Sequence, residues 1–362
     1  MGNRQQVKET FPSAPEYLVY GEKNNVPDRN PYERKAWLSG FALMIKRRAL
    51  DEVGLFDLRY GKGYFEDNDI GVRLRYAGYH LLLCRNSFIF HYGSQSFGKG
   101  AETNRKIVDN SLVFVDKWGF NIEDYAYPRL GILDFIKEEK DAPIRVLEVG
   151  CGAGMILSRI KYQWRNSVIM GIESKEKVAQ LGKDYLGVEW GNVELMEFPY
   201  EKNYFDYIIF SNALETFHSP EHVIGRLMPY LKNSGRMLFS IYNVMHVSAL
   251  MSLLGGRFLH ADAMALHKSH LCHFTLRDIS SVLEQCDLII EDLQGSMEGD
   301  TMCGLPEDIK EALGKLAGNN MELLQIFEYL VMAKRNRLQE ETYVQRIDKK
   351  IRTQTVVESE VV

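Results

Sequence analysis

The chain has 362 residues, and its content of 45% hydrophobic and 26% charged residues is that of a folded protein with room for two domains. A net charge of -5 and a pI near 6.0 argue against a nucleic-acid partner, because phosphate binding needs a basic surface. Five cysteines without a Cys-x-x-Cys pair predict free thiols in a reducing cytoplasm.

The first feature along the chain that carries chemistry is an acidic helix start. Glu66, Asp67 and Asp69 precede or open a helix expected over 70–77. The positive end of a helix partly stabilises carboxylates, which can still accept a proton there. Simple capping of the helix is the alternative interpretation.

Several motifs around this helix together resemble the acceptor half of a family 2 glycosyltransferase with the GT-A α/β fold. The resemblance implies that Asp67 is the general base of sugar transfer. It also implies that His91 helps to bind Mn²⁺ or Mg²⁺ and the diphosphate of a nucleotide sugar. The motifs occupy residues 37–47, 53–57, 64–74, 78–81 and 91–96.

The resemblance covers only the second half of that fold. A nucleotide-sugar half with an Asp-x-Asp metal motif is expected before Trp37, but Asp28 is the single Asp before Asp51. Two interpretations stay open: the chain is the C-terminal part of a longer protein, or the module over 1–125 binds sugars or partners without transferring sugar.

A helix expected over 104–118 bridges this module to the rest of the chain. Its predicted apolar side consists of Ile107, Leu112, Val113 and Val115. A linker is expected over 126–143.

Next comes a buried strand that ends in a glycine turn, over 145–154. The glycines let the backbone turn tightly and approach a ligand, and a helix over 155–162 follows. A second strand over 168–172 ends in Glu173, about twenty residues past the turn, where a carboxylate can accept hydrogen bonds from ribose hydroxyls. A purely structural glycine turn is the alternative.

From about 144 to 335 the chain resembles a class I S-adenosylmethionine-dependent methyltransferase of the small-molecule type. The motifs are the E-V-G-C-G-A-G turn, Glu173 and the runs 205–215 and 231–240, the last interpreted as a helix end, a turn and the fifth strand. The resemblance implies a Rossmann-like seven-stranded α/β domain that ends in antiparallel strands over 288–291 and 327–334. A dinucleotide oxidoreductase is the competing interpretation, but its turn has the form G-x-G-x-x-G.

The resemblance also implies a set of residues that bind the cofactor S-adenosylmethionine. Asn192 departs from the Asp often found against adenine, and Glu215-Thr216 replaces a common Glu-His pair. The expected set is Glu148, Gly150, Cys151, Gly152, Gly154, Glu173, Asn192, Val193, Asn212 and Leu214.

Histidines gather after the fifth strand, where this fold usually inserts its acceptor lid. His270 is the candidate that accepts the proton of the methyl acceptor, with local packing as the alternative. No carboxylate set accompanies these histidines, which disfavours a metal site. The full group is His246, His260, His267, His270 and His273.

Taken together, the two modules predict O-methylation of a sugar or glycan intermediate in cell-surface polysaccharide or glycoconjugate assembly. The alternatives are a glycosyltransferase fragment and a non-catalytic S-adenosylmethionine-binding scaffold that docks glycan assembly proteins. The apolar run 247–254 is too short to span a bilayer, so we expect no transmembrane segment, although peripheral membrane contact through it would suit a lipid-linked glycan. A polar tail is expected over 336–362.

Overall fold

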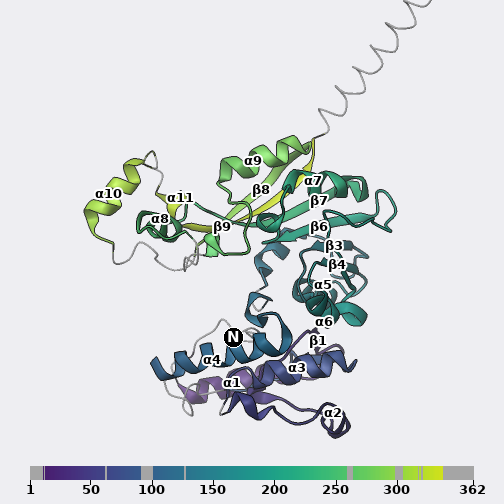
Figure 1. Ribbon diagram of the computed structural model, residues 1–362. Helices are drawn as coiled ribbons and strands as arrows, with labels where there is room; N and C mark the ends of the chain where they lie inside the picture. The colour runs from purple at the N-terminus through teal and green to yellow at the C-terminus, as the bar shows by residue number, and fades with distance from the viewer. Residues whose placement is uncertain are drawn as a thin grey trace, which may run out of the picture. The chain divides into compact units, whose positions relative to one another are not determined.

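The computed structural model describes residues 11, 13–61, 63–90, 101–125, 128–258, 264–297, 305–316, 318 and 321–336. The chain divides into two compact units, 1–197 and 198–362. The main sheet has seven strands in the order β5-β4-β3-β6-β7-β9-β8 (Figure 1). Parallel strands that alternate with helices, followed by an antiparallel end, confirm the expected Rossmann-like α/β fold.

The first unit contains the separate two-stranded sheet and the β3, β4 and β5 strands of the main sheet, with helices around them. Strands β1 and β2 form an antiparallel pair, whereas β3, β4 and β5 are parallel to one another. The elements are α1 (Ala14–Asn24), β1 (Tyr32–Lys35), α2 (Arg47–Val53), α3 (Glu66–Tyr76), β2 (Leu81–Cys84), α4 (Ala101–Trp118), β3 (Arg145–Val149), α5 (Met155–Gln163), β4 (Val168–Glu173), α6 (Glu176–Leu186) and β5 (Val188–Trp190).

Helix α6 shows why the sequence forms these layers. Val178, Leu181 and Tyr185 recur at helical spacing and are buried, so one stripe of the helix faces the core. The helix ends at Gly187, whose φ of 66° is a left-handed conformation that glycine adopts without strain.

Residues before 126 pack directly on α5 and α6 within the first unit. Their side chains share one apolar core that includes Trp37, Phe114, Met155 and Leu181. Polar groups cross the same boundary: Arg75 Nε donates to the Leu181 carbonyl at 2.8 Å, and the Tyr76 hydroxyl donates to a carbonyl of α6 at 2.7 Å. The module is therefore an integral part of this unit.

A buried charge cluster completes that boundary. The Glu33 carboxylate is fully buried and lies 2.6 Å from Lys35 Nζ, 3.3 Å from Arg85 Nη1 and 3.4 Å from Arg159 Nε. Burial lowers the pKa of Lys35. Three cations around one carboxylate offset the cost of burying it, whereas removal of one partner would leave charge uncompensated.

Two helices in this unit differ from the expectations. Helix α3 begins at Glu66, so all three carboxylates lie in its first turn. In α4 the predicted apolar side is partly wrong, because Leu112 is 62% exposed and Phe114 is fully buried. The buried stripe includes Asn110, whose amide donates to the Tyr60 carbonyl at 2.8 Å, and hydrophobic periodicity does not predict a buried polar residue.

The expected linker over 126–143 contains packed structure. Leu130–Phe135 forms a 3₁₀ helix, and Ile132 and Phe135 are buried in it. The domain boundaries expected from the sequence stay a prediction.

The second unit consists of the remaining strands with helices on and beside them. Strand β6 is parallel to β7, and β9 pairs antiparallel with both β7 and β8. The elements are β6 (Phe205–Ser211), α7 (Pro220–Leu227), β7 (Leu231–Tyr242), α8 (Val247–Leu254), α9 (Leu276–Gln285), β8 (Leu288–Met297), α10 (Glu307–Leu316), α11 (Glu322–Gln325) and β9 (Ile326–Arg335).

The expected antiparallel end of the sheet is confirmed, although both strands are longer than predicted. The expectation of a helix end and turn over 231–235 is wrong, because β7 begins at Leu231. An irregularity in the pairing between Phe205 and Tyr207 accommodates the extra residues of β7. Among the described residues, no helix is long and apolar enough to cross a membrane.

We predict that Tyr185→Phe destabilises the first unit. The Tyr185 hydroxyl donates to the Leu81 carbonyl and accepts from the Lys35 backbone N–H at 3.0 Å, all in a buried place. Without the hydroxyl, both of these buried hydrogen bonds are lost, which costs about 1–3 kcal/mol in total. Urea unfolding of the full chain measures the change. Tyr32→Phe, at an exposed tyrosine of β1, is the matched control, and equal unfolding midpoints for the two variants would contradict the packing described above.

Candidate active site

The glycine turn after β3 has a backbone conformation that favours glycine. Gly150, Gly152 and Gly154 have φ values of 69°, 54° and 79°, which side-chain-bearing residues rarely adopt. A Cβ atom on Gly152 would lie 2.5 Å from Cδ1 of Tyr125. Gly150 is exposed, whereas Gly152 lies under the Tyr125 ring and Gly154 lies against Leu186 and Val188, so of the three predicted cofactor residues only Gly150 offers exposed main chain.

Glu173 stands next to this loop at the end of β4. Its side chain is buried, and its oxygens accept from the backbone N–H of Gly152 at 2.9 Å and of Lys175 at 2.8 Å. Burial raises the pKa of Glu173, while these hydrogen bonds oppose the rise. The Ser174 hydroxyl also donates to Oε1 at 3.4 Å, so Oε2 is the oxygen that keeps a further lone pair for a ribose hydroxyl.

Glu148 is the second buried acid of the site. Its Oε2 atom has no hydrogen-bond partner among the described residues, and burial raises its pKa well above the ordinary value. A buried acceptor without a donor is costly, and such groups in native proteins usually await a ligand or water. Acceptors at Glu173 and at Oε2 of Glu148, beside the glycine loop, suit S-adenosylmethionine, whose ribose and amino group carry donors.

The remaining predicted cofactor residues of this unit play mixed roles. Val193 is buried, and burial raises the pKa of the Cys151 thiol, so Cys151 is a neutral wall residue. Asn192 is exposed, and its Oδ1 accepts from the Glu194 N–H at 2.9 Å. That bond uses one of the two lone pairs of the side-chain oxygen that was expected to face adenine.

Two aromatic residues at this site were not predicted from the sequence. Tyr125 packs against Gly152, and burial raises its pKa. Trp190 is at the end of β5, and its Nε1 donates to the Ser174 carbonyl at 3.1 Å, beside Glu173. No local pattern marks Tyr125, whereas a large exposed aromatic at the end of a parallel strand is a usable indication for Trp190.

In the second unit, the predicted residues after β6 are held firmly. Asn212 has a φ of 48°, and its Nδ2 donates to Glu328 Oε1 at 2.7 Å, while Leu214 is buried. Glu215 is also buried; its Oε1 accepts from the Tyr242 N–H at 2.8 Å, and its carbonyl accepts from the Leu271 N–H at 2.7 Å. Glu215 thus connects β7 to the histidine-containing segment.

His270 lies in that segment, close to Tyr242 and two other histidines. Ring centroids of Tyr242, His267 and His273 lie 5.6, 5.6 and 6.3 Å from its own. Burial lowers the pKa of His270 to about 4, so the ring is neutral at pH 7. Its Nδ1 is 3.5 Å from the Ala265 carbonyl. Because a carbonyl only accepts, this contact favours the tautomer with a proton on Nδ1 and a lone pair on Nε2.

The acidic start of α3 has a distinctive backbone. Tyr64 and Phe65, directly before it, have φ values of 69° and 71°. Two consecutive non-glycine residues in this region store strain, which is common at functional sites. Asp67 Oδ2 accepts from the Gly40 N–H at 2.8 Å, and burial raises the pKa of Glu66.

Asp69, by contrast, is a structural group. It is fully buried and accepts from Arg73 Nε at 2.9 Å and Trp118 Nε1 at 3.0 Å, and it lies 2.6 Å from Lys117 Nζ. His91, the predicted metal ligand, lies outside the described residues. Within the described part of the chain, no group of three or more His, Cys, Asp or Glu side chains is placed to hold a metal ion.

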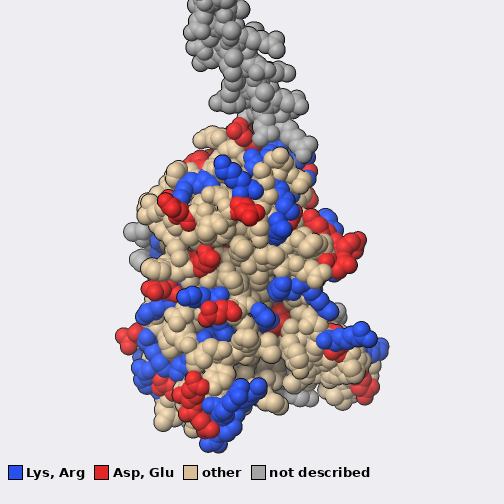
Figure 2. Space-filling model, turned by 90° about the vertical axis from the view of Figure 1, so that its right-hand side faces the viewer, with Lys and Arg blue, Asp and Glu red and all other residues tan. Residues whose placement is uncertain are grey.

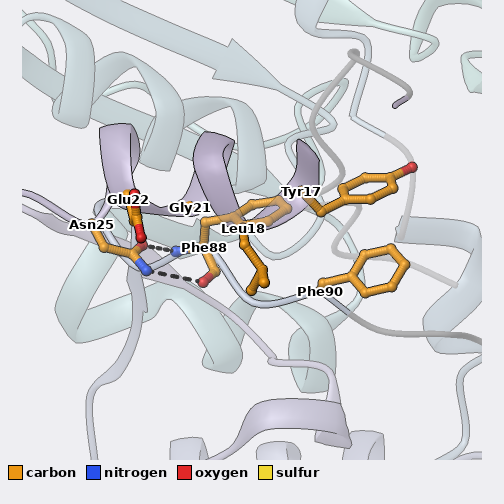
Figure 3. A pocket seen from close by; sticks show the side chains of 7 residues that line it. All are labelled: Tyr17, Leu18, Gly21, Glu22, Asn25, Phe88 and Phe90. Carbon is orange, nitrogen blue, oxygen red and sulfur yellow. Dashed lines mark hydrogen bonds between the residues drawn. The ribbon is translucent and has the colours of Figure 1, made fainter. Parts of the chain in front are cut away.

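Two surface features carry no chemistry of their own. A hollow between α1 and the residues after β2 is lined by Tyr17, Leu18, Gly21, Glu22, Asn25, Phe88 and Phe90 (Figure 3). Its aromatic rings stack on each other, Tyr17 on Phe90 at 4.2 Å, and the Asn25 amide is hydrogen-bonded to the Phe88 backbone. On the face shown in Figure 2, basic and acidic side chains are interspersed.

Comparisons with known proteins give a family match that includes the glycine loop. Residues 122–293, a little under half of the chain, match the family described as "Methyltransferase domain". The chain is also 34% identical over 89 residues to N-acetylglucosaminyl-diphospho-decaprenol L-rhamnosyltransferase from two strains of Mycobacterium tuberculosis. That match covers 25% of this chain and 28% of the relative.

Solved structures with similar coordinates have low sequence identity to this chain. A SAM-dependent methyltransferase from Archaeoglobus fulgidus is 16% identical, with a TM-score of 0.42, and the match covers 62% of this chain and 99% of that one. An S-adenosylmethionine-dependent methyltransferase from Mesorhizobium loti is 16% identical, with a TM-score of 0.39, and the match covers 57% and 96%. At this level of similarity, neither structure indicates a substrate for this chain.

We predict that Gly152→Ala weakens S-adenosylmethionine binding by at least about tenfold. The added Cβ would meet the Tyr125 ring and strain the loop whose N–H fixes Glu173, at a cost of about 1–2 kcal/mol or more. Calorimetric titration measures the affinity. Gly78→Ala is the matched control, because its φ of 82° carries the same strain but no atom lies within 4 Å of the new Cβ. Equal affinity in both variants would contradict the role of this loop in S-adenosylmethionine binding.

We predict opposite effects of Glu148→Gln on the free protein and on ligand binding. The folded-state pKa of Glu148 is raised above its ordinary value of 4.5, so folding stability of the wild type falls as pH rises above that value. Gln carries no ionisable group and escapes this loss. The variant should therefore melt at a higher temperature than the wild type, by a margin that grows with pH, yet bind S-adenosylmethionine about tenfold more weakly. Unchanged affinity would remove Glu148 from the site.

Proposed function

We propose that this chain transfers a methyl group from S-adenosylmethionine to a hydroxyl of a sugar or glycan intermediate in cell-surface polysaccharide assembly, because residues 122–293 match the family described as "Methyltransferase domain". The observation that supports methyl transfer most directly is the buried Glu148 carboxylate beside the positive-φ glycine loop, because its Oε2 atom has no partner among the described residues. The family match covers the same loop.

In this proposal the chain's own groups bind and orient. The exposed backbone of Gly150 approaches the ligand closely, Glu173 accepts from a ribose hydroxyl, and Glu148 accepts from a donor on its methionine part. S-Adenosylmethionine, when bound, supplies an already activated methyl group. What remains for the protein is to hold the acceptor in line and to exclude water.

The proton of the acceptor hydroxyl needs a base, and we assign that role to His270. Its low pKa keeps the ring neutral at pH 7, with a lone pair on Nε2. Glu215 acts as a positioning residue, because its backbone carbonyl holds the Leu271 and Cys272 amides next to His270. Asn212 and Leu214 complete the proposed set at the end of β6.

The glycan acceptor is inferred from the N-terminal part of the chain. The curated relative, named for rhamnosyl transfer to a lipid diphosphate sugar, is matched over only 28% of its length. The motifs over 37–81 and the strained start of α3 suggest that this module still recognises a sugar through Asp67 and its neighbours. In this proposal the reaction takes place in the cytoplasm, at a glycan assembly complex.

Two other functions remain as alternatives. The module could transfer sugar if a nucleotide-sugar half is supplied elsewhere, with His91 and Mn²⁺ or Mg²⁺ as its metal site. A non-catalytic scaffold that binds S-adenosylmethionine and docks glycan assembly proteins is the other alternative, because Thr216 stands where a histidine is common. Incubation with labelled S-adenosylmethionine and glycan fragments separates them: cofactor binding without transfer to any glycan favours the scaffold.

We predict that His270→Ala lowers methyl transfer to a sugar hydroxyl by about a hundredfold, with little change in cofactor affinity. Because the pKa of His270 is about 4, wild-type turnover should not fall near pH 6.5, the ordinary pKa of histidine, and should fall only as the pH approaches 4. Turnover is measured against pH with the labelled cofactor.

His267→Ala is the matched control for this experiment. His267 neighbours His270, but its Nδ1 pairs with Ser269 Oγ at 2.7 Å in a more exposed place. Undiminished turnover of His270→Ala together with an unchanged pH profile would exclude His270 as the base.

A further inference from the structure

Helix α8 is apolar except for Ser248 and Ser252, which share one side, and only its beginning is buried. It contains no charged residue, and its first residue, Val247, packs against Leu313 of α10 and Leu324 of α11. His246 caps it, because its Nδ1 accepts from the Ser248 N–H at 3.3 Å. The first turn is thus packed against α10 and α11, and Figure 1 shows α8 beside α11.

The other end of α8 carries the same apolar stripe into solvent. Leu250, Met251 and Leu254 follow Val247 at helical spacing, but Met251 is 37% exposed and Leu254 is 74% exposed. Phe258, four residues further on, is 50% exposed. A contiguous apolar stripe at the exposed end of a helix is normally covered by a partner surface, so this end is a candidate for contact with something other than water.

The charges around the exposed end identify the class of surface that would cover it. From 247 to 277 the sequence has three basic residues, Arg257, Lys268 and Arg277, and one acidic residue, Asp262. Apolar side chains next to a basic excess are the composition of segments that lie in the interface of anionic bilayers. Arg257 is itself exposed, between Leu254 and Phe258.

We propose that the C-terminal end of α8, with Arg257 and Phe258, inserts into the headgroup region of an anionic lipid bilayer. The Phe258 ring stacks on His273 at 5.4 Å, and His273 lies 6.3 Å from His270. Lipid contact would therefore occur two side chains from the proposed base, where a lipid-linked acceptor would present its sugar. Bilayer binding itself does not depend on methyl transfer.

Co-sedimentation of the full chain with vesicles tests this proposal. The wild type should bind vesicles that contain phosphatidylglycerol, and added salt or vesicles of phosphatidylcholine alone should weaken binding. Leu254→Ser and Phe258→Ser should each lower the partition coefficient on the order of tenfold, and Arg257→Gln should remove most of the salt dependence. Leu58→Ser, at a leucine that is 91% exposed in the first unit, is the matched control and should bind as the wild type does.

Three results would overturn the proposal. They are absence of wild-type binding to anionic vesicles, equal binding by Leu254→Ser, and a concentration-dependent dimer in ultracentrifugation that Leu254→Ser abolishes, since that would show a second copy as the occupant. Melting temperatures of the variants confirm folding. Methyl transfer to a water-soluble glycan fragment should be unchanged in Leu254→Ser, so loss of vesicle binding and loss of the proposed activity are distinguishable.

Discussion

The hydrogen bond from the Gly152 N–H to the Glu173 carboxylate is the constraint on which the proposed cofactor site depends. It joins the loop after β3 to the end of β4, so the two ligand-facing features form together. The bond needs a backbone with positive φ at Gly152, which explains why a glycine is required at that point. A site built in this way is held by main chain, which loses less entropy on ligand binding than long side chains do.

The N-terminal module contributes to that site indirectly. It covers α5 and α6, the helices that follow β3 and β4, with a shared apolar core and several side-chain hydrogen bonds to main-chain carbonyls. Tyr125, at the end of the 3₁₀ helix Ile122–Tyr125, lies against Gly152. Residues that resemble a glycosyltransferase therefore support the loop that is proposed to bind S-adenosylmethionine.

Local sequence was sufficient for the features that depend on local physics. The apolar run before Gly150 predicted β3, and the acid at the end of the next run predicted the position of Glu173 beside the loop. Long-range packing was not predictable in the same way. The buried side of α4 is decided by Asn110, which pairs with carbonyls some fifty residues earlier, and the low pKa of His270 depends on burial by distant segments.

The first residues of β7 and the position of Tyr125 also depend on long-range packing that local sequence does not predict. Periodicity cannot show that the residues after Leu231 continue as a strand, because a pairing irregularity absorbs them. Sequence spacing also cannot show that the Tyr125 side chain packs against Gly152 of the glycine loop. These contacts join elements that only the folded topology brings together.

The way Tyr185 and its helix are covered has a consequence for protein engineering. Carbonyls of α6 at Lys177, Leu181 and Tyr185 receive donors from Tyr76, Arg75 and Arg34. A shortened protein that starts at the linker would expose the apolar stripe of this helix, and it would aggregate unless new polar side chains replaced that stripe. The roles of the two parts of the chain are therefore better studied by single substitutions in the intact chain than by truncation.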